Sequence, residues 1–515
     1  DSLDNPANNN FYFLPLILGL IGMFFHIKKN PKDALVVFML FFMTGMAIIL
    51  YSNQKTYEPR ERDYAYAGSF YAFAIWIGLG VLSVVNWLNK VFKEKKTMSV
   101  AVATVICLIV PTIMAQQGWD DHDRSGKYAA RDFGKNYFAG LLPNSIIISN
   151  GDNDTFPLWY VQEVENCRTD VRVMNYMLSA SEWYAPQMMR KVYDSDPVPF
   201  TMKKEDYYKG VNEIAVFADK GINQAIDIKD FIKLFSEGKL NAKFSDGKYR
   251  GTFPCKKFKL KVDKEKVLAN GIVPPELADK IVDEIVWTVN TNFLTKNDIL
   301  FFDFLASFDW DRPLYITTPN IVNKVFNADK YWYLDVIVYR LMPVECNDAT
   351  YISGIGGVDV DRSYDVLMNK VTWGNLNDPT VTVDRESMRN CMMMRQDYIR
   401  LAVALSDMNK HDSAVKVIDK ALEFFPNHTI QCDYLMLSCV EMYFKANERE
   451  KATELAEIIH KKYLEEAEYY LAQKERFSDY FYEDLETAIS CLVQLTRYMR
   501  TFNETELYEQ YNSEV

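Results

Sequence analysis

The chain has 515 residues, with 58 basic and 70 acidic side chains and a formal net charge of −12. A hydrophobic content of 49% and an aromatic content of 14% exclude a disordered chain. The acidic balance, without a long basic stripe, argues against nucleic acid as a partner. Apolar residues are concentrated before residue 117, and this uneven distribution excludes a wholly soluble protein.

Four apolar runs fill this first part of the chain. They predict transmembrane helices at about 11–27, 34–51, 64–89 and 97–117. Each run approaches or exceeds the ~20 residues that a helix needs to cross a bilayer. One such run can be a buried helix of a soluble protein, but four at regular spacing favour a membrane segment.

Lysines mark two of the short loops, at 26–33 and 90–96. Loops rich in lysine stay on the cytoplasmic side of a membrane. Alternation then puts the second loop and everything after about residue 117 on the opposite side. In a bacterium this predicts a multi-pass protein of the cytoplasmic (inner) membrane, with the residues after about 117 in the periplasm.

The second loop carries three basic and three acidic residues at the predicted membrane surface. Lys55, Arg60 and Arg62 are candidates for binding a lipid phosphate, because a guanidinium offers phosphate oxygens a rigid fork of donors. The supporting carboxylates are Glu58, Glu61 and Asp63. The alternative is a solvated turn with internal salt bridges.

A charged cluster follows the fourth apolar run directly. It consists of Asp120, Asp121, His122, Asp123 and Arg124. Asp121, His122 and Asp123 are candidate ligands of a divalent cation, and the cluster is also a candidate for acid–base chemistry at the bilayer surface. The alternative is a charged collar that anchors the helix end at the interface.

Residues 118–345 have the pattern of an α/β domain with a parallel sheet. Strands are predicted at 145–149, 170–174, 299–305, 312–317 and 334–341, helices at 128–142 and 158–165, and a strand-rich insertion at about 195–270. Ligands bind at the carboxyl ends of parallel strands. The loop after the first strand supplies candidate site residues there: Gly151, Asp152, Asn153, Asp154 and Thr155. The alternative is an Asx-rich turn that caps the next helix.

Residues 346–386 are predicted to be a linker region, and residues 387–515 a helical domain. Tyr398, Leu401, Ala414, Ala421 and Pro426 fall at the spacing of one tetratricopeptide repeat. Such helix pairs bind proteins or peptides on a concave surface. The alternative is a structural lid that packs on the α/β domain.

Several long motifs together resemble one protein family. They lie at 57–64, 119–125, 150–160 and 168–173, with further similarity at 358–365 and 373–376. They are similar to large Bacteroidetes membrane proteins related to human transmembrane protein 260, a protein O-mannosyltransferase with a GT-C membrane fold. The resemblance spans most of residues 50–375.

The resemblance implies a glycosyltransferase that moves a sugar, expected to be mannose, from a polyprenyl-phosphate donor to Ser or Thr of exported proteins. GT-C enzymes place the catalytic carboxylate in their first extracytoplasmic loop, which we expect in an N-terminal part outside this chain, so the catalytic residue is unknown. Arg60 and Arg62 would hold the departing phosphate, residues 120–124 and 151–155 would line the extracytoplasmic mouth, and the repeats would contact the acceptor protein. Apart from a candidate divalent cation, no cofactor is expected.

Two other functions are compatible with these residues. One is a membrane-anchored envelope scaffold that binds protein partners through its helical repeats. The other is a lipid-linked hydrolase or phosphatase that uses the Asp/His cluster with a metal. We rank the transferase first.

Overall fold

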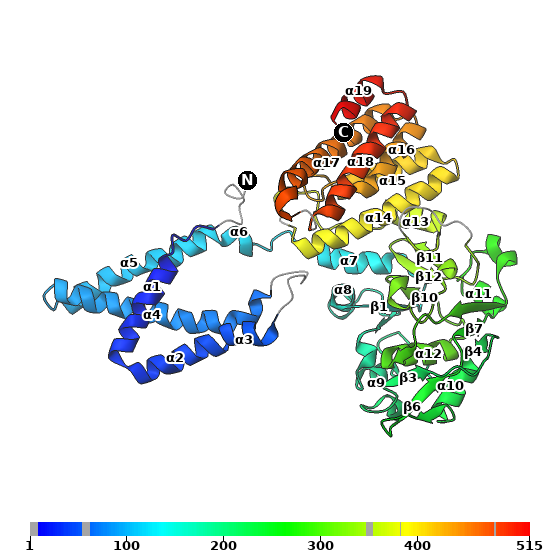
Figure 1. Cartoon of the computed structure of the whole chain (residues 1–515), viewed down its shortest axis with the longest axis horizontal. Helices are drawn as coiled ribbons and strands as arrows, with labels where there is room; N and C mark the ends of the chain where they lie inside the picture. Colours follow the sequence, from blue (N-terminus) through cyan, green and yellow to red (C-terminus); the bar gives the residue numbers. More distant parts are fainter. Residues whose placement is uncertain (1–8, 54–61, 347–353, 382, 478–479, 515) are drawn as a thin grey trace. The chain divides into compact units, whose positions relative to one another are not determined.

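The computed structural model describes residues 9–53, 62–346, 354–381, 383–477 and 480–514. The chain divides into two compact units, Asp1–Ser125 and Gly126–Val515. Figure 1 draws both units, coloured along the sequence from blue at the N-terminus to red at the C-terminus.

The first unit is helical. Its α-helices are α1 (Leu14–Lys29), α2 (Pro31–Met43), α3 (Met46–Ser52), α4 (Ala67–Val91), α5 (Lys96–Gln117) and α6 (Trp119–His122). A 3₁₀ turn, η1 (Asp63–Tyr66), leads into α4. Helix α4 is the centre of the unit, because α1, α2 and α5 all pack against it.

Three helical segments among the described residues are long and apolar enough to cross a membrane. They are Pro31–Ser52, Asp63–Val91 and Lys96–Gln117. The first of them is interrupted at Thr44, whose hydroxyl donates to Leu40 O at 2.7 Å. The predicted span 11–27 forms α1, which has 16 residues and is shorter than the ~20 that cross the hydrocarbon core. The structure therefore supports three of the four predicted spans.

Two glycines let α1 and α4 approach closely. A Cβ on Gly22 would lie 1.8 Å from Trp76 O, and one on Gly80 would lie 2.2 Å from Leu18 O. No side chain fits at either position, so the two backbones are in direct contact. Small residues at a helix crossing are the usual means by which apolar helices associate in a membrane.

The second unit is built on a six-stranded sheet of order β13-β11-β12-β10-β1-β2. The strands are β1 (Ile146–Ser149), β2 (Arg172–Asn175), β10 (Leu314–Ile316), β11 (Trp332–Asp335), β12 (Val338–Leu341) and β13 (Gly357–Val358). β1 pairs in parallel with both β2 and β10, whereas β12 is antiparallel to β10 and β11. The predicted strand 334–341 is therefore part of a hairpin, which turns at Val336 with φ 71°.

Both faces of the sheet are covered. The helices α7 (Ala129–Ala139), α8 (Asp152–Glu163) and α13 (Val360–Asn369) share one buried core with Ile147, Val173 and Tyr315. The helices α9 (Tyr184–Met188) and α12 (Lys296–Ser307) share the other core with Ile146, Ile148 and Met174. This is the α/β arrangement that the alternation of strands and helices predicts.

The apolar run at 299–305 is a helix, where the sequence pattern predicts a strand. It forms the middle of α12, in which every residue from Asp298 to Ala306 is buried. A helix that is buried on all sides carries no polar face, so its sequence has the same continuous apolar run as a central strand. Thr295 and Asp298 close its first turn with a capping box.

The predicted insertion contains two further sheets. One has the order β5-β6-β3-β9 and the other β4-β7-β8. Their elements are β3 (Ile214–Phe217), β4 (Ile226–Asp227), α10 (Ile228–Ser236), β5 (Asn241–Lys243), β6 (Tyr249–Phe253), β7 (Lys257–Lys261), α11 (Lys264–Ala269), β8 (Glu284–Thr288) and β9 (Phe293–Thr295). Asp303 of α12 anchors the start of this region, because its buried carboxylate accepts from Thr201 N at 2.9 Å and from Tyr207 OH at 2.5 Å.

Helices fill the rest of the unit as successive packed pairs. They are α14 (Arg385–Asp407), α15 (His411–Phe424), α16 (Leu437–Lys445), α17 (Arg449–Phe477), α18 (Tyr482–Thr501) and α19 (Thr505–Glu514). Helix α14 packs on α13 and β13, so the helical part and one face of the sheet share a single core.

The segment 346–386, predicted to be a linker region, contains ordered elements of the α/β fold. β13 pairs in parallel with β11, and α13 follows it directly. The Asp359 side chain caps α13 by accepting from Arg362 N. β13 is the outermost strand of the six-stranded sheet on this side.

Candidate functional site

The predicted phosphate-binding loop lies mostly outside the described residues. This applies to Lys55, Glu58, Arg60 and Glu61. Arg62 and Asp63 lie at the start of η1, where the Asp63 carboxylate accepts from Tyr64 N at 3.0 Å. The role of this loop stays a prediction.

The Asp/His cluster forms the short helix α6 and the turn after it. His122 Nδ1 lies 2.6 Å from Gly118 O, and Asp123 Oδ1 accepts from Ser125 N at 2.7 Å. Arg124 donates to Asp121 O at 2.7 Å, and Asp120 stands in the first turn of α6. Within the part of the chain that the structure describes, no group of three or more His, Cys, Asp or Glu side chains is arranged to hold a metal ion. These side chains mainly serve local turns.

The helix that follows β1 begins earlier in the chain than the sequence predicts. Gly151 is the residue before α8, and Asp152, Asn153, Asp154 and Thr155 form the first turn of that helix. They still lie at the carboxyl end of β1. Because β2 and β10 run parallel to β1, Asn175 and Thr317 come to the same edge of the sheet.

Buried polar groups connect the three strand ends. Thr155 Oγ1 lies 2.7 Å from Ser149 Oγ and accepts from Asn175 Nδ2 at 2.8 Å. Thr317 Oγ1 donates to Asp154 Oδ2 at 2.9 Å. Ser149, Thr155 and Asn175 are almost completely buried. The single hydrogen bond from Thr317, which follows β10, holds the Asp154 carboxylate at this edge.

Asp154 belongs to a group of desolvated titratable side chains. Burial raises the pKa of the Asp154 carboxyl, although the hydrogen bond from Thr317 lowers it in part. Burial also raises the pKa of Asp397 on α14, to about 7, although the charge of Arg400 lowers it in part. The pKa of the Tyr137 hydroxyl on α7 is raised well above its ordinary value. Burial is the main cause, and the charges of both carboxylates add to it.

The buried guanidinium of Arg400 is also part of this group. It donates to Tyr339 OH at 2.6 Å and to Ile355 O at 2.9 Å. Arg400 is 1% exposed, so its charge acts on Asp397 with little screening by water. We define the carboxyl-edge cluster as Tyr137, Asp154, Thr317, Asp397 and Arg400.

The carboxyl-edge cluster has the properties of a candidate functional site. A carboxyl with a pKa near 7 is divided between its two protonation states at neutral pH, so it can donate or accept a proton. Desolvated acids beside a charged partner are more frequent at functional sites than elsewhere. The oxygens of Asp154 and Asp397 can also accept hydrogen bonds from the hydroxyl groups of a polar ligand.

Sequence reasoning found Asp154 but missed the other members. Tyr137, Thr317, Asp397 and Arg400 come from α7, β10 and α14, up to 263 residues apart in the chain. One signal was present in the sequence, since Asp397 and Arg400 stand three positions apart on an otherwise apolar helix face. The repeat pattern at 387–515 drew attention to the apolar neighbours Tyr398 and Leu401.

Several cavities lie near the sheet and its insertion, and two of them concern the loop after β1 and the insertion. One, of about 240 Å³, has Asp152 and Asn153 at the start of α8 and is lined mainly by apolar groups such as Phe156 and Trp373. The other, of about 570 Å³, lies where β4, β7 and α12 meet.

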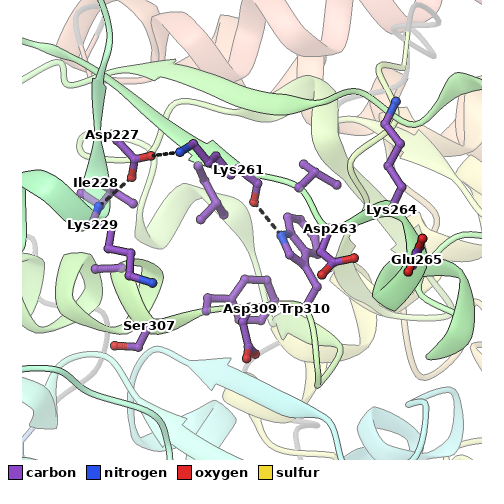
Figure 2. Close-up of a pocket in the computed structure, with 14 residues that line it drawn as sticks. Asp227, Ile228, Lys229, Lys261, Asp263, Lys264, Glu265, Ser307, Asp309 and Trp310 are labelled. Atoms are coloured by element: carbon purple, nitrogen blue, oxygen red, sulfur yellow. Dashed lines mark hydrogen bonds and ion pairs between the residues drawn. The ribbon is translucent and has the colours of Figure 1, made fainter.

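Figure 2 shows one ion pair in the wall of the larger cavity. Asp227 points to Lys261 at 3.4 Å, and the Trp310 indole donates to Lys261 O at 2.8 Å. Lys266, beside the cavity, pairs with Asp309 at 3.1 Å. These charges therefore stabilise the walls of the cavity.

Comparison with known proteins relates part of the chain to one family. The model of the family described as TMEM260-associated domain 2 matches residues 130–362. This range contains all six strands of the large sheet, together with the insertion. The chain is related to TMEM260.

One curated TMEM260 relative is the "Protein O-mannosyl-transferase tmem260" of Dictyostelium discoideum. It is 23% identical over 121 residues, which make up 22% of this chain and 15% of the relative. The match thus spans far less than two thirds of that relative's length. No solved structure matches the chain.

The TMEM260-associated region contains only part of the carboxyl-edge cluster. Tyr137, Asp154 and Thr317 lie within the matched range, whereas Asp397 and Arg400 lie beyond it. The helical part of the chain therefore completes a site that begins in the family region.

Proposed function

We propose that this chain is part of a GT-C-type membrane glycosyltransferase. In this proposal it helps to transfer a sugar, mannose in the first instance, from a polyprenyl-phosphate donor to Ser or Thr of exported proteins. The observation that carries the proposal is the relation of residues 130–362 to TMEM260, joined to three helices apolar enough to cross a membrane. The Dictyostelium relative, a protein O-mannosyl-transferase by name, supports the reaction class.

The donor side of the proposed reaction belongs to the second loop of the membrane unit. Lys55, Arg60 and Arg62 would hold the phosphate that departs from the sugar, because charge develops on that group during transfer. Glu58, Glu61 and Asp63 would orient these cations. Residues 120–124 and 151–155 would line the extracytoplasmic mouth, on the periplasmic side of a bacterial inner membrane.

The acceptor side of the proposed reaction belongs to the second unit. The acceptor is a hydroxyl group on a polypeptide, and Asp154 and Asp397 are acceptors suited to hydroxyl groups. The packed helix pairs from α14 onward, which we propose act as tetratricopeptide-like repeats, would bind the polypeptide around that hydroxyl. This assignment makes the carboxyl-edge cluster a binding site, while the catalytic carboxylate stays unassigned.

A transfer assay tests the proposal. The full-length gene product in lipid is incubated with radiolabelled polyprenyl-phosphate mannose and a periplasmic extract. We expect label in protein, and at least about a tenfold loss of transfer on Arg60→Ala, as for removal of one electrostatic contact to a developing charge. Arg250→Ala is the matched control, because Arg250 pairs with Asp246 on the surface of the insertion and is placed in neither site.

The outcomes separate the candidate functions. Unchanged transfer by Arg60→Ala would remove the phosphate role of the second loop. A folded sample that transfers no label from mannose or from other lipid-linked sugars would contradict the transferase. The envelope scaffold would then be the better function, and a pull-down with the full chain would test it. Release of phosphate that depends on added metal and on His122 would instead support the hydrolase.

A further inference from the structure

A buried arginine without an acidic partner stands at the free edge of the sheet. Arg172, the first residue of β2, is 4% exposed. Its Nη2 donates to Gln187 O at 2.7 Å, while its Nε is buried without a hydrogen-bond partner. Among the described residues, no carboxylate forms an ion pair with it. Burial lowers the pKa of the Arg172 guanidinium, as expected for a cation without a counter-ion.

Two other buried arginines of this unit have acidic partners. Arg340 pairs with Asp335 and Asp359, and Arg395 pairs with Asp433 at 3.0 Å. Arg312 has no acid beside it but donates to five oxygen acceptors, among them Asn144 O at 2.7 Å and Ser195 Oγ at 3.2 Å. Arg172 has one acceptor, so it keeps donors available for another group. A buried and unpaired charge is costly unless a ligand compensates it.

Arg172 lines a cavity of about 510 Å³, a volume within the range of small-molecule sites. The cavity lies between α8 on one face of the sheet and α9 with the turn after it on the other. Its charged lining residues are Arg172, Arg190, Lys191 and Glu163, so three basic groups line it with one acidic group. Lys191 also pairs with Asp196 at 3.6 Å, which leaves Arg172 and Arg190 as the basic groups without an ion pair among the described residues. Glu163 is itself engaged by the Tyr193 hydroxyl. The balance of charge therefore favours an anion.

The walls of the cavity also suit an organic body. Trp159 of α8, the half-exposed Tyr193 and the buried Tyr184 line it. Aromatic rings provide flat apolar surfaces for a ring or a short carbon chain. The turn that carries Tyr193 is held by the bridge between Val192 and Ser195, and Ser195 is fixed by Arg312.

We propose that this cavity binds a small anionic molecule, with a carboxylate or phosphate group on Arg172 and an organic body against Trp159 and Tyr193. Arg190 and Lys191 at the rim would attract the anion, and the Arg172 guanidinium would bind it through its free donors. This site is separate from the carboxyl-edge cluster and does not depend on the proposed transferase function.

Calorimetric titration of the full chain in detergent micelles tests the proposal. Inorganic phosphate and succinate are the probes, each at constant ionic strength. We expect saturable binding at one site, weakened about tenfold or more by Arg172→Met, as for loss of a charge-assisted hydrogen bond. Lys229→Met in the cavity of Figure 2 is the control and should leave the binding unchanged. Binding of phosphate alone identifies a phosphate ligand, and binding of succinate alone a carboxylate ligand.

A second variant keeps the test decisive if Arg172→Met does not fold. Arg190 is exposed, so Arg190→Glu should fold and should weaken binding severalfold by reversing a rim charge. The proposal is overturned if neither anion binds saturably to the wild type. Equal affinity of Arg172→Met, or of Arg190→Glu, and the wild type would overturn it as well.

Discussion

Asp397 shows how burial changes the chemistry of a single residue. Its carboxyl has little water around it and faces Arg400, and its pKa is raised to about 7. Desolvation therefore outweighs the attraction of the nearby guanidinium. Asp154 shows the same direction for the same cause. Two acids that favour protonation within one buried group are unusual in a structural core, where carboxylates are normally ionised and paired.

This environment predicts a stability that depends on pH. The folded-state pKa of Asp397 lies above its unfolded value of 3.8, so the folded chain binds the proton more tightly. The proton on Asp397 therefore stabilises the folded state fully at a pH below the unfolded pKa. This stabilisation is lost as pH rises through about 7, and the free energy of unfolding falls by at most about 1.4 kcal/mol per pH unit. Asp397→Asn should raise the melting temperature by a few degrees at about pH 8 and leave it unchanged at low pH.

Thermal unfolding of the full chain in detergent measures this effect. Asp407→Asn is the matched control, because Asp407 is exposed at the end of the same helix. The control should follow the wild type at every pH. Asp397→Asn leaves Arg400 with its bonds to Tyr339, Ile355 and Gly356, so the variant should fold. A lower melting temperature at high pH would show that the ionised carboxylate stabilises the fold.

At the scale of elements, α12 decides how one face of the six-stranded sheet is built. It is buried along almost its whole length, and it joins the sheet to the insertion through Phe302, Asp298 and Asp303. Phe302 packs against Phe231, Phe258 and Trp287, with ring centroids 5.3–6.3 Å apart. The helix thus forms the wall between the six-stranded sheet and the two smaller ones.

Truncation in the middle of α12 should therefore be costly. We expect Phe302→Ala to lower the free energy of unfolding by about 3–5 kcal/mol, because a fully buried aromatic leaves a cavity. Phe293→Ala is the control, since Phe293 is 49% exposed on β9 and should cost far less. Denaturant unfolding monitored by circular dichroism compares the two. Equal losses would show that α12 is not a central part of the core.

At the scale of the whole molecule, a membrane part is joined to a large α/β and helical part. Lysine-rich ends mark one side of the membrane helices, since Lys90 ends α4 and Lys95 and Lys96 begin α5. The distribution of lysines in the short loops predicts that these ends are cytoplasmic and that the second unit is on the opposite side.

Reporter fusions in a bacterial host check this orientation. Alkaline phosphatase fused after Val515 should be active and green fluorescent protein there should be dark, because only the phosphatase folds after export. Fusions after Lys95 should give the reverse pattern. Phosphatase activity from both positions would contradict the predicted alternation of the helices.

The sequence by itself was sufficient for features that depend on local pattern. Apolar runs of about 20 residues identified the membrane helices, and short β-branched runs identified β1, β2 and β10. The motif at 150–160 marked the end of β1, where Asp154 lies. The long motifs also indicated the relation to TMEM260. Such signals are carried by neighbouring residues, so they can be recognised before the chain is folded.

Tertiary structure alone decided which distant residues meet and which charges stay unpaired. The continuous apolar run at 299–305 fits a strand or a helix, and only its surroundings on all sides make it the buried helix α12. Asp397 joins Tyr137 because α14 packs on the same face of the sheet as α7. Arg172 is distinctive because, among the described residues, it has neither an acid beside it nor more than one hydrogen-bond acceptor. Pairing and desolvation are properties of the folded surroundings, and periodicity along the chain does not encode them.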